Sequence, residues 1–138
     1  DSLVNSYNKM IDDLEDSAVI DSYCECLRDF KTAYHNEKKK PDKEAAMNKW
    51  FNELLVNKLE VFDSIVSNKG SDMSGYAVGG KLSLADVSIY TFLVEYFDNT
   101  EGVLKAYENC PKLKAIVKTV GENEKIKKWI ETRPVGSY

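Results

Sequence analysis

The chain has 138 residues, of which 43% are hydrophobic and 30% charged, and its formal net charge is −4. These values predict a single globular domain with a real core, and the acidic balance excludes a function in binding a nucleic-acid phosphate backbone. No apolar run could span a bilayer, no signal peptide is present, and three cysteines without a framework spacing are typical of reduced intracellular thiols, so we expect a cytoplasmic protein.

The first half of the chain predicts helices. Residues 2–14 have helical apolar spacing and end in a run of acids, and a clean apolar stripe then covers roughly residues 17–36. The lysine run before Pro41 breaks this pattern, because proline disfavours helix at the preceding residue. A second long helix is expected from about residue 43 to residue 67, with Gly70 as its left-handed cap.

Residues 84–97 are apolar on almost every side, which predicts a buried helix at the centre of the domain. Ser83 and Asp86 are spaced as a capping box, in which each polar side chain accepts from the other residue's backbone N–H. We therefore interpret Asp86 as structural rather than as a catalytic acid. Gly79 and Gly80 allow the preceding loop to turn tightly.

The remaining sequence predicts shorter helices. One is expected to begin near Asn99 and run to Tyr107, and another to begin at Pro111 and end at Gly121. A last helix carries Trp129 and is stopped at residues 133–134. No segment indicates a strand, so the predicted fold class is all-α.

Residues 79–86, which read GGKLSLAD, resemble the G-x-x-[LF]-[ST]-x-A-D signature of glutathione transferases. In that family the signature opens the core helix of the C-terminal helical domain. The tail, with CPKL at residues 110–113 and IKKWIETRP at residues 126–134, is similar to the ending of the sigma class. The resemblance implies a glutathione transferase C-terminal-type helical bundle, with a buried central helix, over residues 16–138.

Residues 1–7, which read DSLVNSY, resemble the segment that begins the last helix of the family's N-terminal thioredoxin-like domain. Residues 1–15 would then be a remnant of that helix plus the linker, with nearly all of the thioredoxin-like domain missing. That domain holds the family's catalytic Tyr and most glutathione contacts, so no catalytic residue is assigned here. We expect the 138-residue chain alone to be inactive.

The resemblance implies two glutathione-binding residues. Ser2 matches the Ser that binds the γ-glutamyl carboxylate, although a frayed terminal Ser is an equal alternative. Asp29 aligns with an Asp that reaches the γ-glutamyl amino group of the neighbouring subunit's glutathione. Arg28 replaces an acid of a cluster that holds a divalent ion in some members, so we expect no metal.

The same resemblance makes Lys31, Thr32 and His35 candidates for lining the pocket of the electrophilic co-substrate. The alternative for His35 is an exposed histidine at a helix end. Cys24 and Cys26, two positions apart on a helix, point to nearly opposite sides and cannot share a metal.

The implied function is the helical domain of a glutathione transferase, which supplies the hydrophobic co-substrate pocket and the dimer face. The whole enzyme would conjugate glutathione to electrophiles in detoxification, or isomerise prostaglandins or peroxides, as a homodimer. Glutathione would be a co-substrate, with no cofactor. The alternative is a non-catalytic relative that serves as a structural or protein-interaction module.

Overall fold

The computed structural model describes residues 2–69, 75–78 and 81–132. These residues form helices and connecting loops without a strand, which confirms the predicted all-α class. The elements in chain order are α1 (Ser2–Lys38), α2 (Lys43–Lys49), η1 (Trp50–Leu54), α3 (Leu55–Lys69), α4 (Leu84–Tyr90), η2 (Thr91–Tyr96), α5 (Thr100–Ala106), α6 (Pro111–Gly121) and α7 (Glu124–Thr132). The predictions about Gly70, Gly79, Gly80 and residues 133–134 lie outside the described residues.

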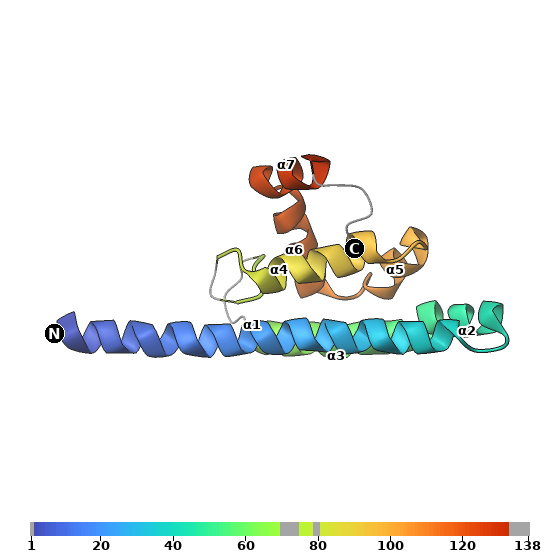
Figure 1. Cartoon of the computed structure of the whole chain (residues 1–138), viewed down its shortest axis with the longest axis horizontal. Coiled ribbons are helices and arrows are strands. Elements are labelled where there is room, and N and C mark those ends of the chain that lie inside the picture. The colour runs from blue at the N-terminus through green and yellow to red at the C-terminus, as the bar shows by residue number, and fades with distance from the viewer. Residues whose placement is uncertain (1, 70–74, 79–80, 133–138) are drawn as a thin grey trace.

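Helix α1 is continuous over 37 residues. The sequence pattern predicts two segments separated near residue 15, and this separation is wrong as secondary structure. No Pro or Gly lies within α1, so nothing forces the backbone out of the helix. The N-terminal third of α1 extends beyond the rest of the bundle (Figure 1). Whether residues 1–15 belong to another domain stays a prediction.

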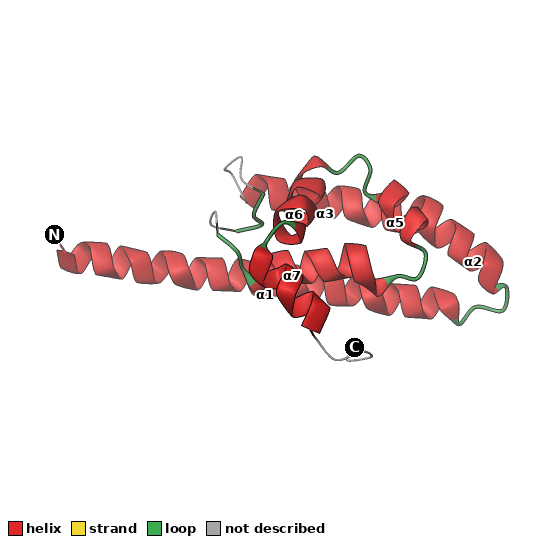
Figure 2. Cartoon of the chain, turned by 90° about the horizontal axis from the view of Figure 1, so that it is seen from above, coloured by secondary structure: helices red, strands yellow, loops and turns green. Residues whose placement is uncertain are grey.

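The bundle has two layers. Helices α1 and α3 form one, and α4 with η2 lies across it together with α5 and α6 (Figures 1 and 2). Aromatic side chains connect the helices within and between the layers: the Phe30 and Phe62 ring centroids, on α1 and α3, are 5.8 Å apart, and those of Phe30 and Phe92, on α1 and η2, are 6.1 Å apart. The segment predicted to be central is indeed deeply packed, since Ala85, Ile89 and Phe92 are fully buried. Its first residue, Leu84, is however exposed.

Two segments expected as ordinary α-helix contain a π-helical turn. Helix α2 continues into α3 through η1, and α4 continues into η2 before the backbone turns extended at Phe97. A π turn holds more residues per turn and therefore re-aims the side chains that follow. The rings of Trp50 and Phe51 in η1 and of Tyr96 in η2 all lie within 6.1 Å of the Tyr34 ring on α1.

Helix α6 begins at Pro111 and ends at Gly121, as the sequence predicts. Its first turn is held by a residue that the sequence did not single out. The buried Asp63 of α3 accepts a hydrogen bond from the Leu113 N–H at 2.9 Å.

Cys110, the residue before α6, is a buried thiol. Its burial, and to a lesser extent the negative charges of Asp63 and Glu60, raise the pKa of the thiol to about 11, so this cysteine stays protonated at neutral pH.

Candidate site between helices α1 and α4

Asp86 fixes the start of α4, and with it one wall of the candidate site. Its Oδ2 accepts from the Ser83 N–H at 2.8 Å and from the Ser83 hydroxyl at 3.0 Å, and the reciprocal capping box is formed. Its Oδ1 accepts from the Ala77 N–H at 2.7 Å, which ties the preceding loop to the helix. The side chain is 0% exposed, and burial raises its pKa although these hydrogen bonds oppose the rise. Asp86 is therefore structural, cut off from solvent and substrate.

A cavity of about 240 Å³ lies where α1 faces α4. Its lining residues come from α1, from α4 and from the first position of η2: Cys24, Leu27, Arg28, Lys31, Leu84, Ser88 and Thr91. Arg28 and Lys31 bring two positive charges to the α1 side, opposite the hydroxyls of Ser88 and Thr91. Such a set of donors suits a carboxylate or another anionic group.

Some of the polar groups that line the cavity already form hydrogen bonds within the protein. The Cys24 Sγ lies 3.6 Å from the Ser88 Oγ, which links α1 to α4. The Thr91 hydroxyl donates to the Ser88 carbonyl at 3.1 Å. Arg28 and Lys31 make no ion pair within the described part of the chain, so both remain able to meet an anion.

An aromatic surface adjoins the cavity at Tyr96. The Tyr96 hydroxyl lies 2.7 Å from the His35 Nε2, and the Lys31 Nζ lies 4.9 Å from the centre of the Tyr96 ring. Burial raises the pKa of the Tyr96 hydroxyl, so it is a neutral hydrogen-bonding group at physiological pH. Lys31 and His35 are one helical turn apart and converge on this ring. The site therefore joins a cationic cavity to an aromatic edge.

Comparison with known proteins decides the family. Residues 25–133 match the family described as "Glutathione S-transferase, C-terminal domain". The chain belongs to this family. The prediction of a glutathione transferase helical domain is thereby confirmed.

Curated relatives of this glutathione transferase domain are mammalian. The chain is 27% identical to Glutathione S-transferase A3 of Mus musculus, and the match covers 94% of the chain and 57% of that protein. It is 28% identical to Glutathione S-transferase alpha-5 of Rattus norvegicus, and this match covers 94% of the chain and 57% of that protein. The chain thus spans little more than half the length of these relatives. Their names are those of the alpha class and give no support to the sigma-like class expected from the tail motif.

Solved glutathione transferases share the fold. The monomeric Na-GST-3 of the hookworm Necator americanus superimposes with a TM-score of 0.69 at 27% identity, covering 89% of this chain and 60% of that one. NaGST-2 gives a TM-score of 0.66 at 25% identity, covering 86% of this chain and 58% of that one.

The residues predicted to line the co-substrate pocket fall in two groups. Lys31 lines the cavity and His35 meets Tyr96 beside it. Thr32 is exposed, does not line the cavity, and donates its hydroxyl to the Arg28 carbonyl at 3.1 Å. Tyr96 was missed because an apolar run gives no sign of which aromatic ring will reach a site.

The residues predicted to bind glutathione are not brought to this cavity. Ser2 is exposed in the first turn of α1, where its carbonyl accepts from the Ser6 hydroxyl at 2.9 Å. Asp29 is exposed on α1 and, with burial, raises the pKa of the Cys26 thiol, an effect that Lys58 opposes. Their roles stay predictions. Among the described residues no group of three or more His, Cys, Asp or Glu could hold a metal ion.

Proposed function

We propose that this domain forms the co-substrate side of a glutathione transferase that conjugates glutathione to electrophiles. The observation that carries the proposal is the convergence of Lys31 and His35 on Tyr96 at the edge of a cationic cavity. An aromatic ring offers a face for a flat apolar electrophile, while Arg28 and Lys31 suit an acidic substituent on it. Peroxide or prostaglandin isomerisation would use the same surface.

Activation of the glutathione thiol is assigned to a thioredoxin-like partner domain, and no described residue is given that role. Ser2 and Asp29 remain the proposed glutathione contacts of this chain, the latter across a homodimer. Glutathione is the only co-substrate proposed, with no resident cofactor. These assignments rest on the resemblance of residues 1–7 and of the α1 segment around Asp29.

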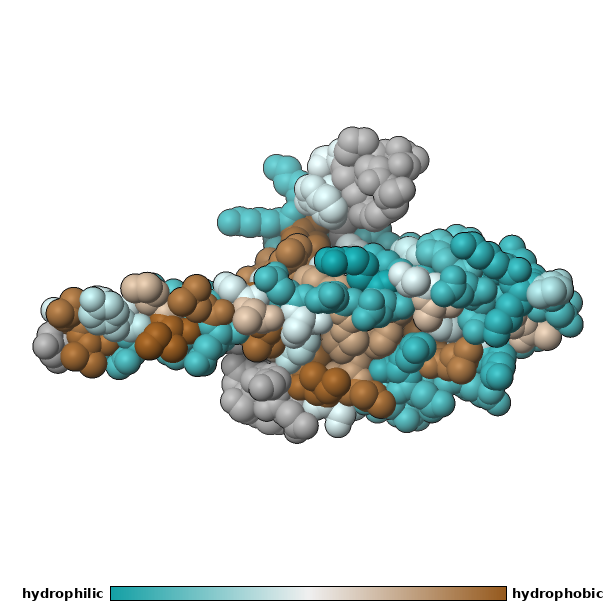
Figure 3. Space-filling view, turned by 60° about the horizontal axis from the view of Figure 1, so that its bottom comes forward, coloured by the Kyte–Doolittle hydropathy of each residue, from teal (hydrophilic) through white to brown (hydrophobic). Residues whose placement is uncertain are grey.

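The exposed end of α1 supports a partner domain. Its apolar side chains are Leu3, Val4, Tyr7, Met10, Ile11 and Leu14, and Leu3 and Leu14 are 62% and 65% exposed. In Figure 3 the projecting helix shows several brown groups among pale and teal ones. Around the axis of α1, Leu3 and Tyr23 point in directions that differ by about 200°. The apolar stripe at the start of α1 therefore lies nearly opposite to the face that buries Tyr23 in the bundle. An uncovered stripe of this kind is typical of an interface, and we assign it to the thioredoxin-like domain.

Three finer expectations also remain proposals: a sigma-like class, a homodimer and a cytoplasmic location. The tail motif supports the first, against the alpha-class names of the relatives. The homodimer is tested by analytical ultracentrifugation of the whole protein, because the similar hookworm protein is described as monomeric. No described helix is long and apolar enough to cross a membrane.

The proposal predicts the kinetics of site variants. We would join to this chain the part of Glutathione S-transferase A3 of Mus musculus that lies outside the match, and measure conjugation of glutathione to an aromatic electrophile that carries a carboxylate. Lys31→Ala and His35→Ala should each raise the KM for the electrophile by about fivefold to tenfold, since a hydrogen bond or contact to a charged group is lost. The KM for glutathione should change little.

Thr32→Ala and Lys39→Ala are the matched controls, because both residues are exposed and neither lines the cavity. They should behave as the parent protein. Equal effects from the controls and the two site variants would overturn the assignment of the cavity to the electrophile.

A further inference from the structure

Helix α7 lies outside the two layers of the bundle. In Figure 1 it is at the top of the molecule, beyond the end of α6 and on the side away from α1 and α3. The Asn123 side chain fixes its start by accepting a hydrogen bond from the Ile126 N–H at 3.1 Å, and the half-buried Ile126 packs against the core. One side of α7 therefore holds it to the protein, and the other side faces solvent.

The solvent side of α7 combines positive charge with an aromatic ring. Around the helix axis, four exposed residues lie within a span of about 100°: Lys125, Lys128, Trp129 and Thr132. We call them the lysine–tryptophan face. Trp129 is 50% exposed, and the two glutamates of the helix, Glu124 and Glu131, lie outside this span. The face thus carries positive charge and no negative charge.

The chain around this face is also cationic. Residues 111–132 contain six lysines and three glutamates, whereas the whole chain has a net charge of −4. Neither Lys125 nor Lys128 forms an ion pair with a carboxylate among the described residues. Positive charge is therefore gathered at one end of an acidic molecule, and this end would be turned towards an anionic partner.

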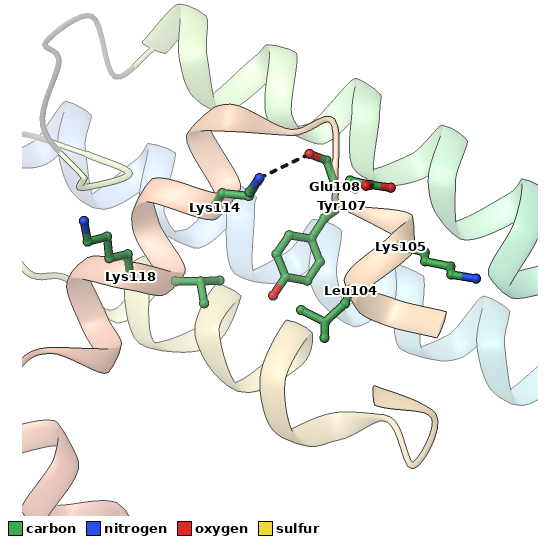
Figure 4. Close-up of a pocket in the computed structure, with 7 residues that line it drawn as sticks. Leu104, Lys105, Tyr107, Glu108, Lys114 and Lys118 are labelled. Carbon is green, nitrogen blue, oxygen red and sulfur yellow. Dashed lines mark hydrogen bonds between the residues drawn. The ribbon is translucent and has the colours of Figure 1, made fainter. Parts of the chain in front are cut away.

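The lysines of the neighbouring helix α6 do not converge on one point (Figure 4). Lys114 reaches towards α5, where its Nζ lies 3.5 Å from the Glu108 carbonyl oxygen. The Lys118 side chain points away from Lys114 and from the Tyr107 ring. Ammonium groups that diverge in this way do not bind one small anion together. They add instead to the attraction of an extended anionic surface, over about 8 Å at physiological salt.

The shape of α7 favours a flat partner over a peptide. Peptides are bound in a groove or along a free strand edge, whereas the lysine–tryptophan face is one convex side of a single helix, and the described residues form no strand. Lysines beside an exposed tryptophan are typical of helices that lie on a membrane surface. An indole ring suits that position because its ring is apolar and its N–H is polar.

We propose that the lysine–tryptophan face binds the surface of a bilayer that contains anionic phospholipids. The Lys125 and Lys128 ammonium groups pair with headgroup phosphates, and the Trp129 indole enters the region between the headgroups and the acyl chains. Each lysine contributes about fivefold to the partition onto the bilayer, so the binding is reversible and weakens as salt is added.

The test is cosedimentation of the 138-residue chain with vesicles at low ionic strength, which needs no transferase activity. We expect saturable binding to an equal mixture of phosphatidylcholine and phosphatidylserine, binding at least about tenfold weaker to phosphatidylcholine alone, and release at high salt. The tryptophan emission should shift to the blue on binding. Trp129→Phe should abolish this shift, because the other tryptophan, Trp50, is fully buried.

Variants test the charge and the ring separately. K125Q/K128Q should weaken binding to the mixed vesicles by about twentyfold. K39Q/K43Q removes the same charge from exposed positions where α1 connects to α2, and should change binding by less than about twofold. Trp129→Ala should also weaken binding, whereas Val61→Ala, at a similarly exposed apolar residue of α3, should not. Circular dichroism shows whether each variant is folded.

Several outcomes would overturn the proposal. The first two are absence of binding to the mixed vesicles and equal binding to phosphatidylcholine alone. Equal loss in the two double-lysine variants would also overturn it. Release of the chain from vesicles by soluble glycerophosphoserine at the concentration of the lipid would identify a site for a single anion. Binding of poly-glutamate without binding of vesicles would identify an acidic protein as the partner.

Discussion

Replacing Asp86 with Ala should lower the free energy of unfolding by about 3 kcal/mol or more, beyond the ~1 kcal/mol typical of a helix cap alone. The reason is that Asp86 accepts from both the Ser83 and Ala77 N–H groups inside the protein, and removing the carboxylate leaves these donors unpaired. Urea unfolding followed by circular dichroism measures the change. Asp42→Ala, which removes an exposed cap of α2, is the matched control and should cost about 1 kcal/mol.

The same residue predicts a pH dependence with a defined sign. Because burial raises the pKa of Asp86 in the folded state, the proton-linked part of its contribution to stability is complete below the ordinary pKa near 3.8 and is lost as pH rises through the raised pKa. The hydrogen bonds to the Ser83 and Ala77 N–H groups remain at neutral pH. The stability advantage of the natural chain over Asp86→Asn should therefore be larger at acid pH than at neutral pH. An advantage that grows with pH would mean that the hydrogen bonds outweigh the cost of burying the charge.

Tyr34→Ala should be the second large loss, about 3–5 kcal/mol, the usual effect of deleting a large buried aromatic side chain. Tyr34 packs against Trp50 of η1 and against Phe97, which directly follows η2: its ring centroid lies 5.5 Å from that of Trp50 and 4.7 Å from that of Phe97. It also contacts the Tyr96 ring at 6.0 Å, so its loss should loosen the ring that Lys31 and His35 share.

The measurement for Tyr34 has two parts. Chemical unfolding gives the stability change, and Tyr7→Ala is the control, since Tyr7 is 57% exposed and should change stability by less than about 0.5 kcal/mol. In the fused protein, Tyr34→Phe should retain stability and the KM for the electrophile. A loss of only about 1 kcal/mol in Tyr34→Ala would contradict the packing role given to this ring.

Local signals in the sequence were sufficient for much of the fold. The capping box at Ser83 and the Pro111 and Gly121 limits of α6 are properties of neighbouring residues, and the structure has them where the pattern indicates. The continuity of α1 was missed because the run of acids near residue 15 indicates a helix end, although the apolar stripe only changes sides there. An apolar stripe can change sides on an unbroken helix when no residue disfavours the helical backbone.

Long-range contacts could not be predicted. Asp63 and the Leu113 N–H that it accepts from are 50 positions apart, and His35 and Tyr96 are 61 positions apart. Neither pair leaves a pattern in one sequence. Lys31 and His35 were identified only through a family resemblance, and the same reasoning included Thr32, whose hydroxyl is bound within its own helix.

The most direct test of the central claim is calorimetric titration of glutathione into the 138-residue chain and into its fusion with the part of the mouse relative that lies outside the match. We predict that the fusion binds glutathione and conjugates it, while the chain alone does neither. Binding by neither protein, with the fusion shown to be folded, would contradict the account and favour a structural or protein-interaction module. Conjugation of glutathione by the chain alone would also contradict the account, because the groups that activate the thiol would then lie within residues 1–138.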